Sequence, residues 1–255
     1  MRKHLTSFVR GAIVPVIVLL VWEACARAGL VSPIVLPAPS AVAAKWWEAL
    51  QSGELVHDSI ASLYRVVVGF VVGAALALPL GLTMGASPRL YGLFNPMLQL
   101  LRPIPPIAYI PLAILWFGLG NPPSVFLIAI GAFFPVLMNT ISGVRHVDGI
   151  YLRAARNLGV GRLALFTRVM LPAATPYILT GVRIGIGTAF IVVIVSEMIA
   201  VNDGLGYRIL EAREFMWSDK IIAGMITIGL LGLALDSAMN TLNNHLLRWH
   251  RGLEH

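Results

Sequence analysis

Six apolar segments, each long enough to cross a bilayer, limit what this chain can fold into. A helical span needs about 20 mostly apolar residues, because each residue adds about 1.5 Å across a hydrocarbon core about 30 Å thick. Hydrophobic residues make up 58% of the sequence and charged residues 12%, against about 25% charged in a typical soluble domain. The pattern predicts an all-α polytopic membrane protein with six transmembrane helices. The segments lie at about 11–28, 60–86, 90–117, 124–143, 173–200 and 221–242.

The second segment carries a row of small residues. They recur at every fourth position, at Gly69, Gly73, Ala77, Gly81 and Gly85. A row at this interval lets two helices approach to backbone distance in lipid. We therefore expect this face to pack against another helix.

The third segment, 90–117, is interrupted near its middle. The stretch LLRPIPPIAYIP places the charged residue Arg102 beside Pro103 and Pro105. Proline removes a helical hydrogen bond and clashes with the preceding turn, so a regular helix cannot run through this stretch. Broken backbone at membrane depth is tolerated only where it is buried in protein or lines a wet cavity. We therefore expect a discontinuous span here.

The distribution of lysine and arginine predicts the orientation. With the N-terminus in the cytoplasm, eleven basic residues fall in inner segments and five in outer ones, which favours this orientation and a cytoplasmic C-terminus. The inner residues are Arg2, Lys3, Arg10, Arg89, Arg145, Arg153, Arg156, Arg162, Arg168, Arg248 and Arg251, and the outer ones are Arg27, Lys45, Arg208, Arg213 and Lys220.

The expected organisation follows from the spans and this orientation. The start of the chain is similar to a secretory signal, but Glu23 interrupts the cleavage region and further spans follow, so we expect a retained span. A short helix after it is expected to be capped by Ser40 and to place Trp46 and Trp47 at the membrane interface. The predicted parts are a cytoplasmic N-terminus at 1–10, a first span at 11–28, a periplasmic segment with this interfacial helix at 29–59, a five-span core at 60–244 with a cytoplasmic loop at 145–171, and a cytoplasmic tail at 245–255.

The loop between the fourth and fifth spans has an informative spacing. Ala154 and Ala155 are followed after three residues by Gly159, and after nine more by a segment that ends in Leu171 and Pro172. A short helix at about 151–158 would offer small residues to another protein, Gly159 would permit the positive φ that ends it, and Pro172 would open the next span. The alternative is an ordinary arginine-rich loop that obeys the positive-inside rule.

This spacing resembles the EAA loop of the inner-membrane permease subunits of bacterial ABC importers. In that family the pattern is Glu-Ala-Ala, three residues, Gly, nine residues and Ile-x-Leu-Pro. Here Arg153 stands where the family has glutamate, and Val169 where it often has isoleucine. The stretches LRPIPPIAYIPLAILWFGLG and SEMIAVNDGLGY resemble the branch that serves nitrate, sulfonate, taurine and bicarbonate importers. Arg-Pro-x-Pro-Pro and Ala-Arg-Glu-Phe are more similar to the alkanesulfonate and taurine members than to the nitrate ones.

The resemblance implies the type I ABC importer permease (MetI-like) fold in the bacterial inner (plasma) membrane. Permeases of this family work as a pair, here expected to be a homodimer, with two ABC ATPase subunits and a periplasmic or lipid-anchored substrate-binding protein. ATP hydrolysis by the partner subunits alternates the permease between inward-open and outward-open states. The implied substrate is a small organic or inorganic anion, in first place of the sulfonate or taurine type. Nitrate, bicarbonate or another small solute is the alternative within the branch.

The same resemblance assigns the loop at 145–171 to energy coupling, because in the family it forms helices that dock into a groove on the ATPase subunits. The sequence contains no Gly-Lys dipeptide, and so no P-loop that could bind nucleotide phosphates. We therefore expect a transport subunit rather than an enzyme, without a cofactor of its own, with ATP and Mg²⁺ bound by the ATPase subunits. The residues expected to act in coupling are Arg153, Ala154, Ala155, Arg156, Gly159, Arg162, Leu171 and Pro172.

Ionisable residues inside a membrane are costly and mark candidate functional sites. Arg102 stands near the middle of its span, and a guanidinium suits a sulfonate or carboxylate in transit. The alternative is that Arg102 pairs with Glu197 or Asp236 and only holds helices together. Arg65 and Glu23 are expected to snorkel toward the outer interface. The residues expected to line a translocation path are Arg102, Pro103, Pro105, Tyr109, Asn139 and Glu197.

Other classes of function fit the sequence less well. Basic residues are scattered between apolar runs rather than gathered on one face, which argues against nucleic-acid binding. Cys25 is the only cysteine and the histidines are dispersed, so we expect no disulfide and no metal site. An ion-coupled secondary transporter would also use broken helices and midplane charges, but the EAA-like spacing argues against it. An intramembrane enzyme would need a nucleophile with a base, or a metal-ligand pair, at membrane depth.

Overall fold

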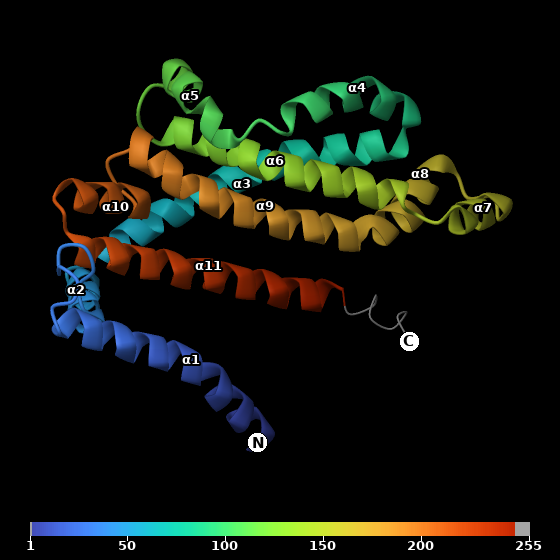
Figure 1. Cartoon of the computed structure of the whole chain (residues 1–255). Coiled ribbons are helices and arrows are strands. Elements are labelled where there is room, and N and C mark those ends of the chain that lie inside the picture. The colour runs from blue at the N-terminus through green and yellow to red at the C-terminus, as the bar shows by residue number, and fades with distance from the viewer. Residues whose placement is uncertain (1, 248–255) are drawn as a thin grey trace.

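The computed structural model describes the backbone of residues 2–247 and the side chains of residues 13–247, and every regular element in this part is helical (Figure 1). The predicted all-α fold is confirmed. The long helices are α1 (Arg2–Arg27), α3 (Glu54–Ala86), α6 (Asn121–Arg145), α9 (Leu171–Ala200) and α11 (Ser218–Leu246). The shorter elements are α2 (Pro39–Gln51), α4 (Pro88–Leu101), η1 (Pro106–Tyr109), α5 (Ile110–Phe117), α7 (Gly149–Asn157), α8 (Arg162–Leu165), η2 (Phe166–Met170) and α10 (Leu205–Glu214).

Most of the predicted spans coincide with long apolar helices. Within the described part, α3, α6, α11 and the stretch Arg162–Ala200 are each long and apolar enough to cross a membrane, and α4 with η1 and α5 makes a fifth if this bent pair is one span. α3 begins at Glu54, so the segment predicted at 29–59 is shorter in the structure. The predicted first span falls on α1, whose side chains are described only from Ile13. The apolar side chains of α1 that are described are largely exposed, as suits a helix in contact with lipid.

The small residues of α3 pack against α6 at backbone distance. A Cβ atom added to Gly73 would lie 2.5 Å from the carbonyl oxygen of Ala129, and one added to Gly81 would lie 2.7 Å from Cβ of Thr140. Ala77, between these two glycines, is fully buried. A larger side chain at either glycine would separate the helices. The predicted helix contact is therefore confirmed, and α6 is the partner.

α6 also meets α9 through the same kind of contact. A Cβ atom on Gly143 of α6 would lie 2.6 Å from Cβ of Tyr177, and one on Gly181 of α9 would lie 2.7 Å from Cβ of Asn139. α6 therefore packs against both α3 and α9, and Figure 1 shows the three helices side by side. Membrane helices rely on such close packing because lipid supplies no hydrophobic drive between them.

The third predicted span is broken, as its prolines indicate. α4 ends at Leu101, the 3₁₀ turn η1 begins at Pro106, and the helices on the two sides of the break are bent by 82° relative to each other. Arg102 occupies the C-terminal cap of α4. In Figure 1, α4 and α5 lie as separate short helices on one side of α6. The break thus places Arg102 beside α6 rather than inside a regular helix.

The connection between α1 and α2 differs from the prediction. Ser40 does not cap α2, because Ala38 is the N-cap residue and makes no side-chain hydrogen bond. Ser40 instead donates its hydroxyl to Oε1 of Glu23 at 2.8 Å and its N–H to Oε2 at 3.0 Å. Arg27 Nε also donates to Glu23, at 2.5 Å. Glu23 therefore ties α1 to α2 rather than snorkelling.

The fifth span begins before Pro172. α8 runs into the π turn η2, which continues directly into α9. A proline inside a helix clashes with the carbonyl four residues before it, and a π turn displaces that part of the backbone. The N–H of Leu171 bonds to the Phe166 carbonyl, five residues earlier, in this way. Pro172 therefore lies within a continuous helical stretch and does not open it.

Replacing Gly73 by alanine tests the close packing of α3 on α6. The added methyl group would overlap the Ala129 carbonyl, so we expect Gly73→Ala to lower the free energy of unfolding by about 1–3 kcal/mol, the usual cost of overpacking. Gly92→Ala in α4 is the matched control, because a Cβ atom there meets nothing within 4 Å. Thermal unfolding of the purified variants measures the difference. A Gly73→Ala protein as stable as Gly92→Ala would contradict the contact.

Candidate functional site: a basic loop and a path beside the broken span

The basic loop folds into two short helices at one end of the bundle. α7 begins after Asp148, whose Oδ1 accepts a hydrogen bond from the Ile150 N–H at 2.9 Å. This bond satisfies an amide that the first turn of a helix leaves unpaired. α7 ends at Asn157, and Gly159 has a φ of 76°, the positive value that the sequence predicts. Local sequence therefore determines both ends of α7.

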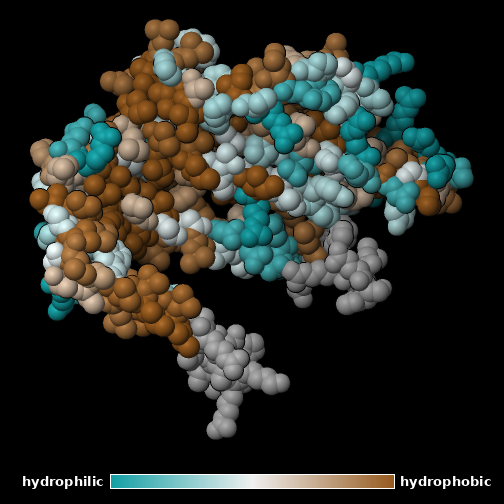
Figure 2. Space-filling view, viewed as in Figure 1, coloured by the Kyte–Doolittle hydropathy of each residue, from teal (hydrophilic) through white to brown (hydrophobic). Residues whose placement is uncertain are grey.

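The end of the molecule that carries α7 and α8 presents apolar side chains outward. Tyr151 is 64% exposed, Leu158 83% and Leu163 78%. Beneath them, a hollow of about 1190 Å³ separates the two short helices from the ends of α3 and α6. Hydrophilic side chains surround this end in Figure 2. An exposed apolar patch rimmed by polar residues marks a surface for another protein.

None of the predicted coupling residues is buried. Arg156 and Arg162 line the hollow of about 1190 Å³. The Arg153 guanidinium folds back over its own helix, 3.3 Å from the Cβ position of Gly149. The exposed members are Arg153, Ala154, Arg156, Gly159, Arg162 and Pro172, and the half-buried ones are Ala155 and Leu171.

Two adjoining hollows open along α6 beside the broken span. Their volumes are about 300 and 360 Å³, and both are lined by Arg102 and Asn139. The Asn139 amide donates to the Pro135 carbonyl at 2.8 Å, which fixes its side chain. Within the described part of the chain, no aspartate or glutamate lines either hollow. An arginine without an acidic neighbour makes these hollows electropositive.

The other residues predicted for the translocation path are placed differently. Pro103 and Pro105 are exposed in the break, and their neighbours Ile104 and Pro106 line the hollow instead. Tyr109 is partly buried against the apolar core between α3, α6 and α9. The structure thus brings Arg102 and Asn139 together and leaves the others outside the hollows.

Glu197 is fully buried and belongs to an ion-pair cluster. Its Oε1 lies 2.7 Å from Nη1 of Arg65, and the two side chains are 0% and 3% exposed. Its Oε2 accepts hydrogen bonds from the Ser62 hydroxyl at 2.8 Å and the Gly206 N–H at 3.0 Å. A carboxylate that is paired and bonded in this way has no free oxygen edge to offer a solute. The structure therefore places Glu197 apart from Arg102 and away from the hollows.

Arg65 fixes the loop between α9 and α10. Its Nε donates to Oδ1 of Asn121 at 2.6 Å, its Nη1 donates to the Asp203 carbonyl at 3.1 Å, and its Nη2 pairs with the Asp203 carboxylate. The loop turns at Gly204, which has a φ of 101° and where a Cβ atom would lie 2.5 Å from Cδ of Glu197. The prediction that Arg65 snorkels is wrong, because its donors are satisfied inside the protein.

A second arginine extends this cluster into α10. Arg208 Nε donates to Oδ2 of Asp58 at 2.6 Å, and Asp58 also accepts the Gly204 N–H at 3.1 Å. Burial lowers the pKa of Arg208, but its hydrogen bonds to Asp58 and Glu211 outweigh burial and raise the pKa above its ordinary value. The guanidinium therefore stays charged and holds α10 against α3.

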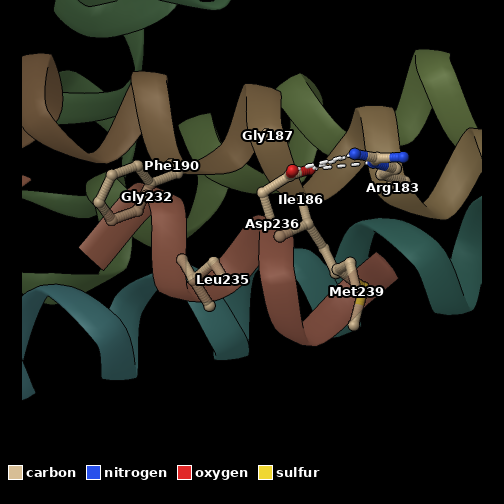
Figure 3. A pocket seen from close by; sticks show the side chains of 8 residues that line it. All are labelled: Arg183, Ile186, Gly187, Phe190, Gly232, Leu235, Asp236 and Met239. Carbon is tan, nitrogen blue, oxygen red and sulfur yellow. Dashed lines mark hydrogen bonds and ion pairs between the residues drawn. The ribbon is translucent and has the colours of Figure 1, made fainter. Parts of the chain in front are cut away.

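Arg183, within α9, also has a carboxylate partner. Its Nε and Nη2 donate to the two carboxylate oxygens of Asp236 on α11, each at 2.9 Å (Figure 3). Glu197 and Asp236 are thus both engaged by other arginines. The alternative that Arg102 pairs with one of them and only holds helices together is therefore wrong.

The match to a known family covers most of this architecture. The family of binding-protein-dependent transport system inner membrane components matches residues 69–251, which include the broken span, the hollows and the basic loop. This chain belongs to that family.

The permease is similar to known relatives over most of its length. It is 38% identical over 248 residues to a protein of Bacillus subtilis (strain 168) named as the aliphatic sulfonates transport permease SsuC, which covers 97% of this chain and 90% of that protein. It is 35% identical over 239 residues to the taurine transport system permease protein TauC of Escherichia coli (strain K12), which covers 92% of this chain and 87% of that protein.

A solved structure shows the same fold. A chain of the MetNI methionine ABC transporter in inward-facing conformations superposes with a TM-score of 0.64 and 16% identity, covering 72% of this chain and 92% of that chain. The predicted type I importer permease fold is confirmed. Family membership also identifies the chain as a membrane-embedded transport subunit of an ABC importer rather than its ATPase, and implies ATPase and substrate-binding partners.

Breaking the buried ion pair tests its role in the permease. Arg65→Met leaves the Glu197 carboxylate buried without its partner, so we expect the free energy of unfolding to fall by about 3–5 kcal/mol. Arg27→Met is the matched control, because Arg27 pairs with Glu23 while 71% exposed, and such a pair contributes about 0–1 kcal/mol. Thermal unfolding in detergent compares the variants. Equal melting temperatures would show that the buried pair stabilises nothing.

Proposed function

We propose that this permease imports a small organic anion of the sulfonate or taurine type. The observation that carries the proposal is Arg102, which lines two hollows that contain no acidic residue within the described part of the chain. Arg65 and Arg183, by contrast, each hold a carboxylate. An arginine without such a partner offers N–H donors in a fork that matches the oxygens of a sulfonate. The names of the sulfonate and taurine relatives support the same substrate class.

Arg102 and Asn139 are the side chains that we propose to meet the anion in transit. Pro103 and Pro105 would act through the backbone, because they prevent α4 and α5 from joining into one regular helix beside the hollows. In this proposal Tyr109 and Glu197 have structural roles, in the apolar core and in the ion-pair cluster.

We infer that α7 and α8 form the element that couples the permease to its ATPase. The exposed Tyr151, Leu158 and Leu163 would enter a groove on the partner, and Arg153, Arg156 and Arg162 would meet charge at its rim. ATP and Mg²⁺ would be bound by the ATPase subunits. Their ATP cycle would move α7 and thereby alternate the permease between inward-open and outward-open states.

We further propose a homodimer with both ends of the chain in the cytoplasm. The start of α1 and the end of α11 point toward the side of the bundle that carries α7 (Figure 1). The excess of lysine and arginine supports a cytoplasmic position for this side. A second copy would cover the hollows, which are open in the single chain, and complete a path between the two subunits. Most of the predicted cytoplasmic tail, 245–255, lies outside the described residues.

Charge reversal on α7 tests the coupling element. Arg153→Glu combined with Arg156→Glu would place negative charge where a partner is adapted to positive charge, so we expect the amount of co-purified ATPase to fall by about tenfold or more. Lys45→Glu combined with Arg213→Glu is the matched control, because these residues lie in α2 and α10, away from the loop. Recovery of ATPase at wild-type yield by the α7 variant would exclude this surface.

Uptake into proteoliposomes tests the substrate and the role of Arg102 together. The binding protein is added outside the proteoliposomes, and ATP is supplied on the side of the ATPase subunits. Under these conditions we expect ATP-dependent uptake of taurine or an alkanesulfonate. Arg102→Gln is expected to lower it by at least about tenfold, because a hydrogen bond to a charged group contributes about 1.5–3 kcal/mol. Arg89→Gln, on the exposed start of α4, is the control. Uptake of nitrate but not sulfonate by the wild type would refute the substrate, and full activity of Arg102→Gln would remove this residue from the path.

A further inference from the structure

The path beside α6 contains a second arginine without an acidic partner. The hollow of about 360 Å³ extends from Arg102 to Arg145, the last residue of α6. The acid nearest to Arg145 in sequence is Asp148, which instead caps α7 by accepting the Ile150 N–H. No carboxylate of the described residues lines this hollow.

A contact with α4 holds the Arg145 guanidinium in place. Its Cζ atom lies 3.9 Å from the centroid of the Tyr91 ring. Tyr91 is itself partly buried against the apolar cluster that contains Leu137 and Ile141. A cation–π contact uses a face of the planar guanidinium, so the N–H donors around its edge remain free for another ligand. An arginine that served only the positive-inside rule would need no such support.

Further polar side chains complete the wall of this hollow. Asn139, Ser142 and His146 follow one another at three- and four-residue intervals, so they share one face of α6. His146 Nδ1 donates to the Ser142 carbonyl at 2.7 Å, and its ring stacks on Tyr177 with centroids 5.9 Å apart. These contacts fix the ring at the rim of the hollow. The wall thus combines two arginines with polar side chains that can form hydrogen bonds.

We propose that Arg145, with Ser142 and Asn139, forms a second anion site that receives the sulfonate group of the solute after Arg102 releases it. This inference depends on the proposed function and adds a position to the same path. A guanidinium fork can donate two parallel hydrogen bonds to a sulfonate or carboxylate. Two neighbouring sites also suit transport, because each can bind weakly enough for the anion to leave.

Charge-selective labelling tests the site without measuring transport. The single cysteine of the chain, Cys25, is replaced by serine, and Met138→Cys introduces a reporter, because Met138 lines both hollows. The permease, assembled with its ATPase subunits in lipid nanodiscs, is treated with an anionic sulfonatoethyl or a cationic trimethylammonioethyl methanethiosulfonate. Intact mass of the permease chain gives the two labelling rates.

The anionic reagent should react faster than the cationic one. We expect Arg145→Gln to lower the anionic-to-cationic rate ratio by about tenfold, the effect of removing one nearby charge in a partly solvated site. Arg145→Lys keeps the charge and should retain most of the ratio. Arg89→Gln is the matched control, because it removes the same charge from an exposed residue of α4 that lines neither hollow, and it should leave the ratio unchanged.

Two results would overturn the site. One is a ratio in Arg145→Gln equal to that of the parent, and the other is an equal fall in Arg89→Gln, which would reveal a general surface potential. The labelling result is separate from the proposed function. Import of an uncharged solute by the wild type would refute the substrate class and leave the measured potential at Arg145 unchanged.

Discussion

The close contact of α6 with both α3 and α9 is the constraint on which the rest of the structure depends. Helices in lipid gain little from hiding apolar side chains, so backbone approach at small residues supplies the packing. Gly73 of α3 and Gly181 of α9 both lie so close to α6 that a methyl group would collide with it. These contacts fix the rotation of α6, so that Arg145 and Asn139, which also packs against Gly181, line the hollows beside the broken span. Residues that touch no solute therefore determine where the hollows lie.

The pairing of charges separates structural arginines from those available to a solute. A buried arginine without a partner is costly, and Arg65 and Arg183 each meet a carboxylate from another helix. Of these two, only Arg65 is buried. Arg102 and Arg145 are exposed like Arg183, but they line hollows that contain no carboxylate of the described residues. Whether an arginine is paired or available to a solute depends on which side chains the acidic residues bind. Glu197 in α9 and Asp236 in the middle of α11 are both already bound to arginines.

The sequence predicted features that depend on local rules, and it missed those that depend on distant partners. The row from Gly69 to Gly85 predicted a helix contact, and the prolines after Arg102 predicted a broken span, because small residues and missing N–H groups act through their own backbone. The partners of Arg65 could not be foreseen in this way. Glu197 lies 132 residues away, and its position depends on how α3 and α9 pack. The sequence predicts a helix cap at Ser40 for the same reason. Its actual partner, Glu23, comes close to it only in the folded chain.

The position of Arg145 joins the proposed path to the proposed coupling element. This residue lines the hollow along α6 and also the larger hollow beneath α7 and α8. α6 ends at Arg145 and α7 begins at Gly149, so a displacement of α7 reaches the end of α6 through a very short connection. Tyr91, which holds the guanidinium, belongs to α4 and does not share that connection. In the proposed mechanism, movement of α7 relative to α4 would therefore act on the contact between Arg145 and Tyr91, and the ATPase cycle would reach a residue that we propose to bind the anion.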